Sequence, residues 1–246
     1  TEEVNSSLYE IRVLPKPNLL HFSISLSYPA YLHKIEESLD NNGNLTVPQG
    51  TRITWKFRTA HSDEVLFATD SRRLRIPCNN DQCSFQIQAK GDFAYTVSIR
   101  NRYLNAPDSL SYYISVIPDA YPEIRVESSK DSLYFDRFYF KGNILDDYGF
   151  KKLQFVYFIT KEKDTTRKQT KTELPLQTDV TAQDFYYYFD AQTLTMEPGE
   201  TLHYYFEVWD NDGVNGSKGS RTHEMQFRLP SADELRRQSE EVKSQT

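Results

Sequence analysis

Several features that usually mark a membrane protein or an enzyme are missing from this sequence of 246 residues. No apolar run approaches the roughly 18 residues that a membrane helix needs. The chain also lacks a Gly-x-Ser-x-Gly elbow, a His-Glu-x-x-His motif, a phosphate loop and a Gly-x-Gly-x-x-Gly fingerprint. Its 5 histidines are dispersed. We therefore expect no catalytic site.

A strongly basic surface is lacking too. The formal net charge is −6, from 29 Lys and Arg against 35 Asp and Glu, and no segment is rich enough in Lys and Arg to follow a phosphate backbone. We expect no nucleic-acid partner. The sequence opens on Thr1 without a basic and then apolar leader, so we expect an excised segment or a processed form.

Cysteine is scarce, and both residues lie in RIPCNNDQCSF, as Cys78 and Cys83. The turn-forming residues between them can bring the two Cα atoms to the roughly 5.5 Å that a disulfide needs. Two cysteines without a nearby histidine are too few ligands for structural zinc. We predict a disulfide that closes a hairpin, which would favour an oxidising, extracytoplasmic compartment. Two free thiols are the alternative.

Alternation with period two dominates the chain and predicts an all-β fold. LHFSISLSY, TRITWKF and FAYTVSI alternate before residue 118, and similar runs recur up to Leu229. Each half offers about seven short strands, which is typical of an Ig-like β-sandwich. We predict two tandem Ig-like domains, 1–118 (with an N-terminal extension) and 119–230. Trp55 and Trp209 lie in alternating strands and are expected in the two cores.

After Pro230 the pattern changes to that of a helix. Ser231 and Glu234 have the spacing of a capping box, which predicts the start of a helix over residues 231–246. Leu235 and Val242 are seven residues apart, as in the first heptads of a coiled coil. The alternative is a solvent-exposed helix with frayed ends.

A set of phrases, taken in order, carries a family resemblance: YEIRVLPKP, SYPAYL, LTVPQGTRITWKF, PDAYPEIRV, GNILDDYGFKKLQFVY, and EVWDNDGVNGSKGS before LPSADEL. Together they resemble the periplasmic region of large envelope proteins of Bacteroidota, filed as domain of unknown function 4175. The resemblance implies membrane helices before this segment, tandem Ig-like domains within it and a long helical region after it. The family has no established activity to transfer.

The run DFYYYFD is unusually aromatic. Alternation places Phe185, Tyr187 and Phe189 on one face of a strand, and Tyr186 and Tyr188 on the other. One set must lie outside the core or beneath a neighbouring element. Exposed tyrosines can pack against a sheet edge or the other domain, bury in a protein partner, or stack on a glycan.

The phrase DNDG, from Asp210 to Gly213, is similar to the start of a calcium loop but fails as an EF-hand, because the expected glycine and glutamate are absent. Alone it predicts a turn. Ig topology nevertheless brings it to the same pole as the loop that holds Asp146 and Asp147. The acidic residues expected there are Asp119, Asp146, Asp147, Asp210 and Asp212. Calcium, basic side chains or backbone N–H groups could offset their repulsion.

We expect these loops to lie side by side where the chain enters the second domain, and to stiffen that joint. No metal site or other cofactor is assigned, with calcium kept as an alternative to a metal-free joint. The sequence thus predicts a non-catalytic, extracytoplasmic segment of a membrane-anchored envelope protein, acting as a spacer and as a protein-interaction module. A glycan-binding module that uses Tyr186 and Tyr188 is the second hypothesis.

Overall fold

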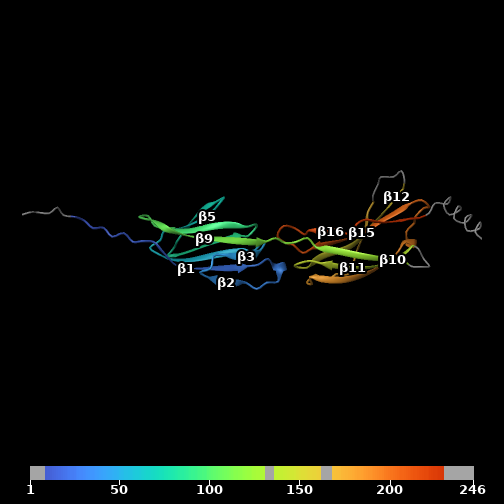
Figure 1. Cartoon of the computed structure of the whole chain (residues 1–246), viewed down its shortest axis with the longest axis horizontal. Coiled ribbons are helices and arrows are strands. Elements are labelled where there is room, and N and C mark those ends of the chain that lie inside the picture. Colours follow the sequence, from blue (N-terminus) through green and yellow to red (C-terminus); the bar gives the residue numbers. More distant parts are fainter. Residues whose placement is uncertain (1–8, 131–135, 162–167, 230–246) are drawn as a thin grey trace, which may run out of the picture. The chain divides into compact units, whose positions relative to one another are not determined.

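The computed structural model describes residues 9–130, 136–161 and 168–229, without the side chains of 105–108 and 130. The chain divides into two compact units, residues 1–118 and 119–246, each described here by itself (Figure 1). The predicted all-β fold is confirmed, with only two short 3-10 helices, η1 (Ala30–Leu32) and η2 (Ala191–Thr193), among the described residues. None of the described helices is long and apolar enough to cross a membrane. The helix predicted over 231–246 lies outside the described residues.

Unit 1 is a sandwich of two sheets. Its strands are β1 (Asn18–Ser27), β2 (Glu37–Asp40), β3 (Leu45–Pro48), β4 (Arg52–Ala60), β5 (Glu64–Thr69), β6 (Arg73–Pro77), β7 (Gln82–Gln88), β8 (Phe93–Arg100) and β9 (Asn105–Ile117). One sheet has the order β2-β1-β4-β7 and the other β3-β9-β8-β5-β6. The pairing of β3 with β9 is parallel and the other described pairings are antiparallel.

The core of unit 1 is centred on Trp55, which is fully buried as predicted. Its indole Nε1 donates a hydrogen bond to the Tyr95 hydroxyl at 3.1 Å, and that hydroxyl donates to the Gly43 carbonyl at 2.9 Å. Both polar groups are therefore satisfied inside the core, which avoids the cost of burying an unpaired donor. Phe67 packs against the rings of both residues.

Unit 2 is a second sandwich. Its strands are β10 (Glu123–Lys130), β11 (Arg137–Leu145), β12 (Phe150–Thr160), β13 (Thr170–Glu173), β14 (Ala182–Asp190), β15 (Thr201–Asp210), β16 (Gly219–Arg221) and β17 (Met225–Arg228). One sheet has the order β10-β11-β14, and the other has the order β13-β12-β15-β16, with β17 also paired to β15. The arrangement is Ig-like, with the loops gathered at the two ends of the sheets.

The core of unit 2 is built mainly from aromatic rings. Phe140, Phe155 and Phe206 are buried, with ring centroids 5.0 to 6.0 Å apart. Gly142 makes room for this packing, because a Cβ there would collide with the ring of Phe185. The high aromatic content noted in the sequence is thus largely core, since each ring buries a large apolar area.

The last strand-like run of the sequence, 223–229, forms only the short strand β17, and β16 lies before it. β16 pairs with the end of β15 and β17 with its beginning. Between them the backbone N–H of Thr222 donates to the Phe206 carbonyl at 2.9 Å, and the Phe206 N–H donates to the Thr222 hydroxyl at 3.1 Å. Thr222 therefore continues the hydrogen bonding to β15 in the gap between β16 and β17.

Candidate functional site

The two acidic loops of unit 2 lie side by side. One joins β11 to β12 and the other follows β15. The Asn211 side chain donates to the Tyr148 carbonyl at 2.9 Å, and the Asn211 backbone N–H donates to the Gly149 carbonyl at 3.2 Å. Gly149 has φ +114°, and a Cβ there would collide with the Thr178 carbonyl. Only glycine fits this contact without strain.

Lys218 is the centre of this pole. Its ammonium Nζ lies 2.7 Å from Asp210, 3.0 Å from Asp119 and 3.1 Å from Asp212. The three carboxylate side chains are 1, 4 and 0% exposed, and the Lys218 side chain is 15% exposed. Asp119 is the first residue of unit 2. The cluster therefore fastens the point where the chain enters unit 2 to the loop that follows β15.

Backbone hydrogen bonds explain why DNDGVNGSK folds in this way. Asp210 Oδ1 accepts the N–H groups of Lys218 at 2.7 Å and of Asp212 at 3.2 Å. Asp212 Oδ1 accepts those of Val214 at 2.7 Å and Asn215 at 3.1 Å. Each aspartate thus forms the short-range turn that its residue type favours, and turns a second carboxylate oxygen toward the ammonium group.

Asp146 and Asp147 accept hydrogen bonds from backbone N–H groups, whereas the other three carboxylates contact the Lys218 ammonium. Asp146 Oδ2 accepts the N–H groups of Tyr148 at 3.0 Å and Gly149 at 2.9 Å, and so shapes its own turn. Asp147 Oδ2 accepts the N–H of Ala120 at 3.4 Å, next to the start of the unit. All five predicted acidic residues are therefore at this pole, but they divide into a lysine cluster and a turn.

The carboxylates differ in their affinity for protons. Burial raises the pKa of Asp119 to about 7, although Lys218 opposes the rise. Burial would raise the pKa of Asp212 as well, but the N–H groups of Val214 and Asn215, together with Lys218, outweigh it and lower that pKa to about 2. Burial would lower the pKa of Lys218, but its hydrogen bonds to the three carboxylates raise it.

Lys218 supplies the positive charge that calcium would supply in a metal-bound loop. Basic side chains were one of the groups expected to offset the repulsion at this pole, but the sequence did not identify Lys218 in particular. Lys218 could have been identified because it is the one basic residue in the stretch from Asp210 to Gly219. Within the described ranges, no group of three or more His, Cys, Asp or Glu side chains is arranged to hold a metal ion.

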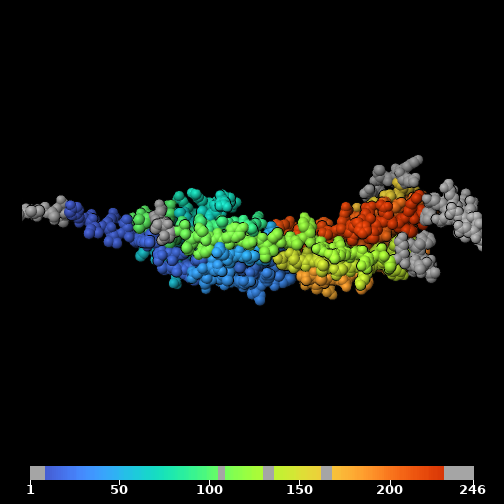
Figure 2. Space-filling model, viewed as in Figure 1, coloured from blue at the N-terminus to red at the C-terminus, as the bar shows by residue number. Residues whose placement is uncertain are grey.

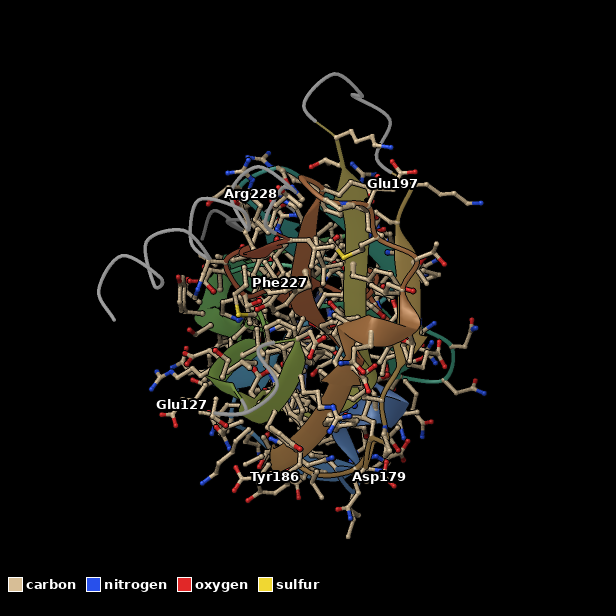
Figure 3. All side chains as sticks on the ribbon, turned by 90° about the vertical axis from the view of Figure 1, so that its right-hand side faces the viewer. Glu127, Asp179, Tyr186, Glu197, Phe227 and Arg228 are labelled. Carbon is tan, nitrogen blue, oxygen red and sulfur yellow. A yellow bond between two sulfur atoms is a disulfide. The ribbon has the colours of Figure 1, made fainter. Side chains whose placement is uncertain are left out.

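The tyrosines of β14 form a second candidate site. Tyr186 is 72% exposed and Tyr188 is 46% exposed, while Phe185 and Phe189 on the opposite face are buried. Figure 3 shows Tyr186 at the outer margin of the molecule. Tyr139 of β11, 45% exposed, pairs with Tyr188, and their ring centroids are 5.1 Å apart. The sequence did not identify Tyr139, because only the strand register brings it to this face. We call Tyr139, Tyr186 and Tyr188 the tyrosine face.

Trp209 does not lie in the core, so that prediction was wrong. It is on the outer face of the sheet β13-β12-β15-β16, only partly buried, and its ring packs on Gly219, where a Cβ would come within 2.9 Å of the indole. The Lys152 ammonium lies 5.4 Å from the centroid of the ring. Alternation alone cannot tell the two faces of a strand apart when both carry large side chains.

The disulfide between Cys78 and Cys83 is confirmed, with the Cα atoms 4.5 Å apart. The expected hairpin needs a correction, however. The flanking strands β6 and β7 belong to different sheets of unit 1, and only Asn79 and Gln82 pair across the turn. The bond therefore closes a tight turn at a crossover between the two sheets.

Neither a family model nor a curated protein matches the sequence. Among solved structures, the chain is similar to the fibronectin(III)-like modules of Clostridium thermocellum CbhA, with 10% identity, TM-score 0.27, and 78% of this chain and 93% of that one covered. It is also similar to a marsupial T cell receptor, with 10% identity, TM-score 0.34, and 85% and 73% covered. A third match is dimeric latent PorU from Porphyromonas gingivalis, with 10% identity, TM-score 0.27, and 87% and 20% covered. Similarity this low carries no inference about activity or partners.

Proposed function

We propose that this chain is a non-catalytic, extracytoplasmic segment of an envelope protein, in which two Ig-like units act as a spacer and present a protein-binding surface. The observation that carries the proposal is the tyrosine face. Its three rings contribute little to the core, yet they gather on one sheet of unit 2. Tyrosine combines a large apolar area with a polar tip, which is the composition of protein-binding surfaces.

Two further observations support the spacer and its compartment. Lys218 binds Asp119, the first residue of unit 2, so that the chain entering this unit is anchored by an ion pair. The disulfide of unit 1 is of the kind that persists in oxidising compartments. The resemblance to domain of unknown function 4175 favours the periplasm and a membrane anchor elsewhere in the full-length protein.

Glycan binding is the alternative use of the same surface. A sugar ring stacks on a flat, open aromatic face. The rings of Tyr139 and Tyr188 are tilted by 41° and pack on one another, so they offer no common plane to a sugar. The pair is therefore a poor platform for a sugar, which leaves Tyr186, 72% exposed, as the ring at which glycan and protein must be distinguished.

Among the described residues, the nearest approach to a catalytic arrangement is a chain of hydrogen bonds through His203. Its Nε2 lies 2.8 Å from the Thr160 hydroxyl and its Nδ1 lies 2.7 Å from Glu224. Hydrolysis also requires an oxyanion site beside a concave binding site. The concave surfaces described on this sheet surround Trp209 instead, and the His203 ring stacks on Phe158 at 4.8 Å. We interpret the hydrogen bonds of His203 to Thr160 and Glu224 as a structural link between neighbouring segments of this sheet. Ester hydrolysis by the purified protein that disappears in Thr160→Val would contradict a non-catalytic role.

Photo-crosslinking tests the proposed function directly. A photoreactive amino acid at Tyr186 of the full-length protein should capture protein in envelope preparations, whereas the same group at exposed Tyr103 of unit 1 should not. Capture of glycan alone at Tyr186 would support the alternative. Equal capture at both positions, or none at Tyr186, would count against a protein-binding tyrosine face.

A further inference from the structure

β14 is the longest of the described edge strands and the richest in aromatic residues. In the described part of the chain it pairs with β11 alone. It forms the lower margin of unit 2 in Figures 1 and 2, where it is orange. Edge strands are normally protected against pairing by shortness, charge or proline. Three other edges, β2, β3 and β13, have 4 residues each, and the edges β6 and β10 carry charged residues. The edge β7 is uncharged, with 7 residues and one aromatic ring. β14 has 9 residues, five of them consecutive aromatics.

The hydrogen-bonding parity of β14 shows which backbone groups face outward. The Ala191 N–H donates to the Asp136 carbonyl, and the Asp146 N–H donates to the Thr181 carbonyl, both at 3.0 Å. These bonds continue the register of β11 with β14 beyond its two ends. Since hydrogen-bonded pairs alternate along an antiparallel ladder, the odd-numbered residues of β14 bond to β11. The even-numbered residues, Tyr186 among them, direct N–H and C=O toward the free edge.

The two charges on β14 do not protect this edge. Asp184 accepts a hydrogen bond from the Asn143 side chain at 2.7 Å, on the neighbouring strand β11. Asp190 accepts one from the Gln192 N–H at 3.0 Å and lies 3.8 Å from Arg137. Both carboxylates are thus engaged within unit 2. No lysine, proline or glycine occurs in the strand.

The sequence of β14 is complementary to itself in one register. If two copies pair antiparallel about Tyr186, each even residue meets an even residue, so that all the outward backbone groups find partners. Tyr186 then faces its own copy, and Asp184 faces Tyr188. On the inner face, Phe185 meets the half-buried Tyr187. A register centred on Tyr187 would instead place Asp184 opposite Asp190 and oppose two like charges. One centred on Phe185 would leave Phe189 and Asp190 of each copy without a strand residue opposite, whereas the register about Tyr186 pairs the whole of β14.

We propose that the partner of this edge is a second copy of the chain, joined to it by antiparallel pairing of the two β14 strands in the register centred on Tyr186. The proposal rests on the proposed function, since it names the protein that Tyr186, at the edge of the tyrosine face, would contact. The interface is isologous, as closed dimers require.

Cysteine crosslinking tests the register. The natural cysteines are joined to each other, so a cysteine placed on β14 is the only free thiol. In Tyr186→Cys the two Cα atoms would lie about 5.5 Å apart across the twofold axis, within disulfide range. The matched control is Asp184→Cys, whose two copies would be about 14 Å apart. We expect a covalent dimer from the first variant and none from the second. Equal crosslinking of both, or of neither, would overturn the register.

Sedimentation tests the pairing itself. The wild-type chain should show a concentration-dependent dimer, and Tyr186→Lys, which adds an edge charge at an exposed position, should be monomeric. Tyr186→Pro removes an outward N–H and should also be monomeric while the ladder to β11 is retained. Tyr139→Lys changes the tyrosine face on the interior strand and should leave a dimer. A wild type that stays monomeric up to about 1 mM would overturn the proposal. If such a monomer still crosslinked to another envelope protein, the proposed function would stand without it.

Discussion

In unit 1 a covalent bond between Cys78 and Cys83 closes the crossover turn, whereas in unit 2 the ammonium of Lys218 holds three carboxylates and two chain segments together. The disulfide is broken by reductants but not by a change in pH or salt concentration. Reductants do not affect the lysine cluster, but its stability depends on the protonation of its carboxylates. Neighbouring units of similar architecture can therefore be loosened by different conditions.

The largest effect expected from this comparison is that of Lys218→Met. The substitution leaves Asp119, Asp210 and Asp212 buried without their cation, which should destabilise unit 2 by about 3–5 kcal/mol. Each unit holds one of the two tryptophans, so the Trp209 emission in a Trp55→Phe background follows unit 2 in urea. The control is Lys171→Met, which breaks a single, more exposed ion pair with Glu207 and should cost less than about 1 kcal/mol. Equal costs would contradict a central role for Lys218.

The next effect is a pH dependence that belongs to unit 2. The pKa of Asp119 is about 7 when folded, against 3.8 for an ordinary aspartate. The folded state thus binds this proton more tightly, so the stabilisation by this group is complete below about pH 4 and is lost as pH rises toward 7. Relative to Asp119→Asn, the unfolding free energy of the wild type should fall by about 2–4 kcal/mol over that range.

Asp212 provides the opposite check. Its lowered pKa of about 2 gives stability that is present above about pH 4 and lost as pH falls toward 2. The variants Asp119→Asn and Asp212→Asn should therefore change different arms of the pH profile measured by urea unfolding. Parallel profiles for the two variants would show that the carboxylates are not held in different environments.

The fold could be predicted because alternation is a local property of the sequence. The alternating runs named in the sequence coincide with β1, β4 and β8 within one to three residues at most ends, as at Phe93–Arg100. Of the other strands of unit 1, β5, β6 and β7 were not delimited in the sequence, and β2 and β3 were missed because 4 residues are too few to show a period. Trp209 was misplaced because β15 carries large side chains on both faces.

The candidate site was only partly predictable, for a related reason. Topology alone brought Asp146 and Asp210 to one pole. The identity of the neutralising group depends on where one long side chain points, and this is decided by the turn that Asp210 and Asp212 form with the backbone. Tyr139 joins Tyr188 only through the register of β11 with β14. A single sequence gives no direct measure of register.

A smaller effect should follow from removing the disulfide of unit 1. The double substitution Cys78→Ser, Cys83→Ser opens a short loop, so chain entropy predicts a loss of about 2 kcal/mol in unit 1. Trp55 emission in a Trp209→Phe background reports that unit. Reductant should produce the same loss in the wild type and leave the unfolding of unit 2 unchanged. A change in unit 2 would mean that the stabilities of the units are coupled.

The smallest effect concerns the two faces of β14 and asks whether the tyrosine face stabilises unit 2 at all. Tyr186 is largely exposed, so Tyr186→Ser should change the unfolding free energy of the monomer by less than about 0.5 kcal/mol. The adjacent Tyr187 points inward, with its ring centroid 4.9 Å from that of Phe155. Tyr187→Ser should cost about 2 kcal/mol or more, through lost burial and the cavity left behind. Urea unfolding at low protein concentration keeps association out of the measurement. If both substitutions lower the unfolding free energy by the same amount, Tyr186 stabilises unit 2, and this would contradict the role of the tyrosine face as a contact surface.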